Sequence, residues 1–255
     1  MTHCLRTYDR GVLRVTVDRP AKRNALSREV LRELRSVFEM HAVREDLRLA
    51  VLAGAGELAF SAGADLDELH QLRDPEEVER YVDEATAALD MIRFFPVPTV
   101  AVLNGAALGG GAELALACDM RVAAPHARIG FTHAKLNLST AWGGGVDLMR
   151  LVGSAAALEL LASARTLSAE EARAVGLVNQ VAPRPVGFID FVDRFLEPLA
   201  ERPPHLLRAL KSQATAERLG ASAERRRETD RERFVQTWTH AAHWAAAQAW
   251  DQGRR

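Results

Sequence analysis

Glu113 is the residue of this sequence whose surroundings best suit acid–base chemistry. One alanine separates it from the glycine run at 109–111, and Leu114 and Ala115 follow it. A carboxylate one turn into a helix and among small apolar residues is poorly solvated, which suits a general acid or base. The alternative is an ordinary acidic side chain that the helix dipole favours near an N-terminus.

The glycine run predicts a turn that brings main-chain amides close to a ligand. Glycines adopt backbone conformations closed to other residues, and the first turn of the following helix carries unpaired N–H groups suited to a negative oxygen. A second segment of small residues lies at 60–69 and includes Ala62, Gly63 and Ala64. One amide from each segment, aimed at one carbonyl oxygen, would form an oxyanion hole. A tight turn beneath packed elements is the alternative for the glycines.

Alternating strands and helices are expected to position these two segments. Residues 13–17 alternate with period two, and residues 47–52 predict the next strand. Residues 99–103 are continuously apolar and rich in β-branched side chains, which is typical of a strand covered on both faces. Ser27 and Asp74 are predicted to cap helices. This order favours an α/β core.

The character of the chain changes after about residue 185. Earlier, Ser168 opens a capping box, and Gly176 stands where that helix should end. From residue 187 onward only helical periodicity remains. We therefore predict an α/β core over residues 1–185 and a helical region over residues 186–255.

Composition excludes several classes of protein. The 255 residues carry a formal net charge of -1, so we expect no nucleic-acid partner and no anionic membrane partner. Residues 94–118 are long and apolar, but their prolines and glycines predict short soluble elements instead of a membrane span. The eight histidines and two cysteines show no metal-ligand spacing. So few cysteines suggest a reducing compartment, and we expect a cytoplasmic protein.

Residues 60–66 followed by residues 109–114 resemble the crotonase superfamily, that is, the enoyl-CoA hydratases and isomerases. Residues 23–27, 98–102 and 168–178 support the resemblance. It implies a ββα-spiral core with a helical C-terminal trimerisation region, and hence a homotrimer or a dimer of trimers. It also implies an acyl-CoA substrate, with coenzyme A as part of the substrate and no separate cofactor.

The resemblance also assigns roles to individual residues. The amides of Ala64 and Gly110 would hold the thioester oxygen as it becomes an enolate, and Glu113 matches the first of two hydratase glutamates. The residues implied to line the pantetheine and adenine path are Arg23, Ala25, Leu26, Ala62, Asp65 and Leu66.

The second glutamate of the family pattern is missing, because Lys135 stands at its position. A charged lysine has no lone pair with which to accept a proton. Lys135 could lose its charge on burial, pair with Glu113, or point outward and leave Glu113 to work alone. If the missing acid limits hydration, the change Lys135→Glu should increase it. His133 lies two positions earlier, and Trp142 and Gly143 stand where the family's acyl pocket is bounded.

Three reactions of a thioester enolate are compatible with this pattern. Hydration of a 2-enoyl-CoA is the leading expectation. Decarboxylation of a malonyl-type acyl-CoA and isomerisation of an enoyl-CoA are alternatives, since each needs the oxyanion hole and only one acid–base group. His133 with Trp142 is similar to the ethylmalonyl-CoA decarboxylase branch. A non-catalytic RNA-binding relative is a distant alternative. An RNA-binding surface should be uniformly basic, but the arginines near the C-terminus alternate with acidic residues.

Overall fold

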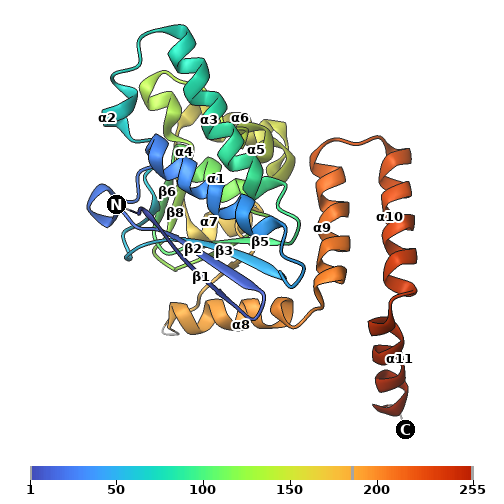
Figure 1. Cartoon of the computed structure of the whole chain (residues 1–255). Helices are drawn as coiled ribbons and strands as arrows, with labels where there is room; N and C mark the ends of the chain where they lie inside the picture. The colour runs from blue at the N-terminus through green and yellow to red at the C-terminus, as the bar shows by residue number, and fades with distance from the viewer. Residues whose placement is uncertain (1, 185–186, 254–255) are drawn as a thin grey trace.

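Two β-sheets form the core of the computed structural model, which describes residues 2–184 and 187–253 (Figure 1). The larger sheet has the strand order β1 (Cys4–Asp9), β2 (Val12–Val17), β3 (Leu49–Gly54), β5 (Thr99–Leu103), β7 (Met120–Ala123) and β10 (Gln180–Val181). The smaller sheet has the order β4 (Ala59–Ser61), β6 (Ala106–Leu108), β8 (Arg128–Gly130) and β9 (Thr166–Ser168). All neighbouring strands are parallel except β1–β2 and β8–β9. Parallel neighbours need crossover connections, so the predicted α/β class is confirmed.

Helices cover both faces of the larger sheet. On one face lie α1 (Arg28–Ala42) and α3 (Pro75–Arg93), and on the other lies α8 (Phe188–Ala200) (Figure 1). Every residue of β5 is buried, as its unbroken apolar run predicts. Val192 and Leu196 of α8 pack against the valines of β3, β5 and β7. Because helices cover both faces of these strands, apolar and polar residues do not alternate along their sequences.

The helix caps expected from the sequence are present. The side chain of Ser27 accepts a hydrogen bond from the Val30 N–H, and that of Asp74 accepts from Glu76 and Glu77. Ser168 forms a complete capping box at the start of α7. The other helices that precede α8 are η1 (Pro20–Lys22), α2 (Leu66–Leu69), α4 (Gly110–Ala117), η2 (Thr132–Leu136), α5 (Gly144–Val152), α6 (Ser154–Ser163) and α7 (Ala169–Ala174).

The long apolar stretch over residues 94–118 folds as a strand, a second strand and a helix, namely β5, β6 and α4. Its prolines and glycines therefore divide it as predicted. Among the helices of the described residues, none combines the length and apolarity that crossing a bilayer requires.

The C-terminal part is helical, as its periodicity predicts. After α8 come α9 (Pro204–Arg218), α10 (Ala223–Trp238) and α11 (Ala241–Gly253). Figure 1 shows α9 and α10 side by side, with α10 and α11 standing away from the sheets. The predicted boundary between residues 185 and 186 falls outside the described residues.

Candidate active site

The carboxylate of Glu113 is buried at the start of α4 and has partners on both oxygens. Its side chain is 1% exposed. Oε2 accepts hydrogen bonds from the main-chain N–H groups of Trp142 at 2.9 Å and Gly144 at 2.8 Å. Oε1 lies 3.0 Å from Nε2 of His133. These contacts hold the carboxylate in one orientation.

The two small-residue segments predicted from the sequence lie against each other. A Cβ placed on Gly63 would lie 2.6 Å from the carbonyl oxygen of Leu108 and 3.0 Å from the nitrogen of Gly110. A Cβ on Gly111 would lie 2.2 Å from the carbonyl oxygen of Ser61. Only glycine permits this approach, and the φ of +100° at Gly63 favours glycine as well.

Two residues that line the cavity carry main-chain donors without partners among the described residues. Within residues 2–184 and 187–253, the amide N–H groups of Ala64 and Gly110 make no hydrogen bond, and both residues line the cavity that Glu113 lines. The neighbouring amide of Asp65 instead donates to the carbonyl of Leu26 at 3.1 Å. Unpaired donors at a cavity are available to a ligand oxygen.

The cavity has a volume of about 360 Å³ and a largely apolar wall. Trp142 packs on the glycine turn so closely that a Cβ on Gly110 would lie 2.3 Å from its ring. The ring of Tyr81 meets Trp142 edge-on, with centroids 6.0 Å apart. Burial raises the pKa of Tyr81, so its hydroxyl stays protonated. The aliphatic side chains of the wall are Leu66, Leu69, Val78, Val82, Leu136 and Leu138.

The structure separates the predicted site residues into two groups. Those that line the cavity are Ala62, Ala64, Leu66, Gly110, Glu113, His133 and Trp142. Arg23, Ala25, Leu26, Asp65 and Gly143 are not among the lining residues. Arg23 is exposed, and Ala25 and Leu26 are buried. Asp65 forms an ion pair with Arg19 at 2.9 Å.

Lys135, which the family resemblance places at the second acid–base position, is exposed and is not a lining residue. Both Lys135 and His133 belong to the 3₁₀ turn η2. Residues two apart in a 3₁₀ helix point about 120° away from each other, since one turn takes about 3 residues. This geometry turns His133 toward Glu113 and Lys135 toward solvent.

A buried ionic cluster lies behind the loop that binds Glu113, and the sequence analysis did not identify it. Arg93 donates from Nη2 to the carbonyl of Trp142 at 2.9 Å and from Nε to Asp147 at 3.0 Å. Arg218 of α9 reaches the same Asp147 carboxylate at 2.8 Å. A Cβ on Gly143 would lie 2.8 Å from Nη2 of Arg93, so glycine is needed there.

Lys211 extends this cluster from α9. Its ammonium donates to Asp119 and to the carbonyl oxygen of Arg93, the latter at 3.0 Å. Burial lowers the pKa of Lys211, while the carboxylate of Asp119 acts in the opposite direction. Two cationic side chains of α9, Lys211 and Arg218, thus bind residues next to the helices and loop that form the site. No sequence signal links residues so far apart.

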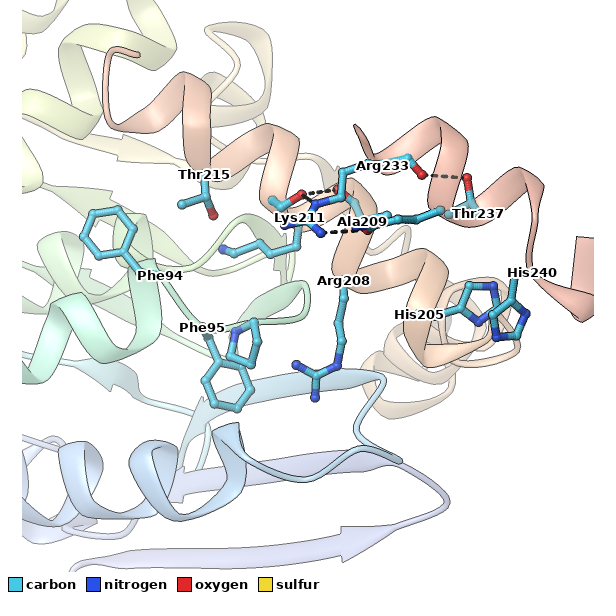
Figure 2. A pocket seen from close by; sticks show the side chains of 13 residues that line it. Phe94, Phe95, His205, Arg208, Ala209, Lys211, Thr215, Arg233, Thr237 and His240 are labelled. Carbon is cyan, nitrogen blue, oxygen red and sulfur yellow. Dashed lines mark hydrogen bonds between the residues drawn. The ribbon is translucent and has the colours of Figure 1, made fainter. Parts of the chain in front are cut away.

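A second, larger hollow of about 560 Å³ lies between α9, α10 and the loop at 94–96 (Figure 2). Arg208, Lys211 and Arg233 are among its lining residues, and His205 stacks on His240 with centroids 3.6 Å apart. It shares no lining residue with the Glu113 cavity. In the described part of the chain, no group of three His, Cys, Asp or Glu side chains could hold a metal ion.

Comparisons with known proteins point to one family. The family model for enoyl-CoA hydratase/isomerase matches residues 7–252. The rat mitochondrial methylglutaconyl-CoA hydratase is 38% identical over 177 residues, which cover 69% of this chain and 56% of the relative. The mouse mitochondrial enoyl-CoA hydratase domain-containing protein 2 is 39% identical over 171 residues, which cover 67% and 57%. The chain spans 56–64% of the length of three curated relatives that it matches.

Solved structures match over almost the whole chain. The crystal structure of an enoyl-CoA hydratase from Bacillus anthracis has a TM-score of 0.92 at 30% identity, covering 99% of this chain and 97% of that one. An enoyl-CoA hydratase from Mycobacterium smegmatis has a TM-score of 0.92 at 28% identity, covering 100% and 98%. These matches confirm the crotonase fold expected from residues 60–66 and 109–114. The chain belongs to the enoyl-CoA hydratase/isomerase family.

Proposed function

We propose that this protein adds water to the double bond of a 2-enoyl-CoA thioester in the Glu113 cavity. The observation that carries the proposal is the pair of unpaired amides, Ala64 and Gly110, at the same cavity as a buried carboxylate. The hydratase names of several relatives support it. Coenzyme A enters as part of the substrate, and the proposed reaction uses no other cofactor.

In the proposed reaction the thioester oxygen accepts hydrogen bonds from the amides of Ala64 and Gly110. Glu113 accepts a proton from water as the water oxygen bonds to C3, and the C2=C3 electron pair moves toward the thioester. The resulting enolate oxygen carries negative charge, which the two donors stabilise. Each well-placed donor of this kind lowers the barrier by about 3–4 kcal/mol.

The cavity wall favours a short, apolar acyl group. Trp142 and Tyr81 close the space beside Gly110 with aromatic rings, and the remaining wall is mostly aliphatic. Crotonyl-CoA is therefore the first substrate to test. Mass spectrometry should show a gain of one water, and Glu113→Gln should lower the turnover at least ~100-fold, as expected for loss of a general acid–base group. A loss below about threefold would remove Glu113 from the mechanism.

Decarboxylation of a malonyl-type acyl-CoA is the second candidate. Glu113 is the only carboxylate among the lining residues that the structure describes, so the cavity lacks the paired acids of an ordinary hydratase. Decarboxylation needs the oxyanion donors and one proton donor for the enolate carbon. Loss of carbon dioxide from methylmalonyl-CoA, with no hydration of crotonyl-CoA, would favour it. A changed retention time without a change in mass would indicate isomerisation.

We also propose that the protein works as a homotrimer or a dimer of trimers in the cytoplasm. Phe234 and Trp238 of α10 are 61% and 47% exposed, and the 560 Å³ hollow separates the α9–α10 pair from the loop at 94–96. Exposed aromatic side chains of this kind are typical of an interface. Cys4 and Cys118 are free and buried, which suits a reducing compartment. Sedimentation velocity tests the assembly.

A further inference from the structure

Among the described residues, His133 contacts a carboxylate that is 1% exposed, whereas His3 pairs at 3.3 Å with Glu29, whose side chain is 57% exposed. His41 binds the main-chain carbonyl of Val37, and His126 binds main-chain carbonyls as well. The only polar contact of the His133 imidazole within the described residues is Oε1 of Glu113 at 3.0 Å, because its Nδ1 has no partner there. His41 and His126 thus bind the backbone, whereas the imidazole of His133 contacts the carboxylate of Glu113.

The contact involves the oxygen of Glu113 that binds no main-chain donor in the described residues. Oε2 already accepts from two main-chain N–H groups, of Trp142 and Gly144. Oε1 accepts from no backbone donor, and His133 lies beside it on the cavity wall. Any proton that Glu113 takes from water or returns to the substrate therefore passes within 3.0 Å of the imidazole.

We propose that His133 is the second catalytic acid–base residue of this site, in the role that paired carboxylates share in an ordinary hydratase. This inference rests on the proposed hydration. The proposed step begins from a carboxylate on Glu113 and an imidazolium on His133, with Nε2–H donating to Oε1 across the 3.0 Å contact. An imidazole changes its charge within the physiological range of pH, so it can both give and take this proton.

The proposed proton transfers return Glu113 and His133 to their starting states. Water bonds through its oxygen to C3 of the enoyl-CoA and gives one proton to Oε1 of Glu113, and the C2=C3 pair moves into the enolate. C2 then takes the Nε2 proton of His133, which leaves a lone pair on Nε2. The proton on Oε1 moves to Nε2 and restores both groups, so the net change is the addition of one water.

The test removes the imidazole and then supplies it from solution. His133→Ala should lower kcat for crotonyl-CoA hydration at least ~100-fold with little change in KM, and imidazole added to the assay should restore part of the turnover. His133→Gln retains an amide donor but cannot transfer a proton, so it should be as slow as His133→Ala. His126→Ala is the matched control, because His126 is exposed and contacts only main-chain carbonyls. It should keep full activity and show no response to imidazole.

Two outcomes overturn the proposal: a His133→Gln variant that retains more than about a third of kcat, or a His133→Ala variant that imidazole does not restore. A separate measurement distinguishes this failure from failure of the hydratase assignment. Exchange of the C2 hydrogen of butyryl-CoA in D2O needs the same proton transfer but no addition of water. If the wild-type protein hydrates nothing, loss of exchange in His133→Gln still supports the proton role, and unchanged exchange overturns it.

Discussion

Replacing Asp147 by alanine should destabilise the protein far more than removing an exposed carboxylate. The Asp147 side chain is 5% exposed and accepts from Arg93 at 3.0 Å and from Arg218 at 2.8 Å. Breaking a buried ion pair by deleting one partner costs about 3–5 kcal/mol, because the remaining charge stays buried without compensation. Both arginines keep other acceptors, among them the carbonyl of Trp142 for Arg93, so we expect about 3 kcal/mol.

The exposed pair between Arg14 and Asp193 provides the matched control. It has a similar separation of 2.9 Å, but its side chains are 47% and 55% exposed. Such pairs contribute about 0–1 kcal/mol, so Asp193→Ala should change the free energy of unfolding by less than ~1 kcal/mol.

Urea unfolding of both variants, followed by far-UV circular dichroism, gives the two values directly. A loss of about 3 kcal/mol corresponds to a decrease in Tm of roughly 6–12 °C for a chain of this size. Asp147→Ala should also lower kcat, because Arg93 holds the carbonyl of Trp142, whose amide binds Glu113. If the two variants unfold within about 1 kcal/mol of each other, the argument that the cluster supports the site is refuted.

Three further predictions concern single positions and pH. Lys135→Glu should leave crotonyl-CoA hydration within about twofold of wild type, because the side chain is exposed and outside the cavity wall; an increase of tenfold would show that residue 135 reaches the substrate. Gly110→Ala should lower kcat by about 100–1,000-fold, since its methyl group would collide with Trp142 and displace one oxyanion donor; full activity would exclude that amide from the site. Burial raises the pKa of both Cys4 and Cys118 to about 12 from 9.0. The unfolded chain therefore loses these protons first, so the free energy of unfolding should fall as the pH rises from 9 toward 12. A urea midpoint that stays constant over that range would contradict this prediction.

Helix-capping residues could be predicted from the sequence because each acts within the first turn of its own helix. Ser27, Asp74 and Ser168 cap their helices as expected, since a side chain reaches an amide two or three residues away wherever the rest of the chain lies. Residues 177–181 include three apolar side chains, yet only Gln180–Val181 pairs with β7. Leu177 and Val178 are buried in the core without joining the sheet, and an apolar run alone does not distinguish the two cases.

The candidate site shows the same limit. The closeness of the segments at 60–66 and 109–114 could be predicted only through the family resemblance, because spacing along the chain says nothing of it. Which side chains of η2 point into the cavity depends on how this short turn is rotated, and the sequence does not show that rotation. The assignment of Lys135 to the second acid position therefore did not reveal that His133 contacts Glu113. Arg93 and Arg218 were missed because their shared partner, Asp147, lies 54 and 71 residues away.

The ionic cluster has a consequence for how the protein is made. Asp147 and Asp119 leave the ribosome 71 and 92 residues before their partners Arg218 and Lys211, a delay of about 4–18 s at ~5–20 residues per second. Until α9 emerges, Asp147 has only Arg93 as a cationic partner, and Asp119 lacks Lys211. A nascent intermediate of this kind should stay open and bind chaperones, and release before residue 218 should leave a fragment that aggregates.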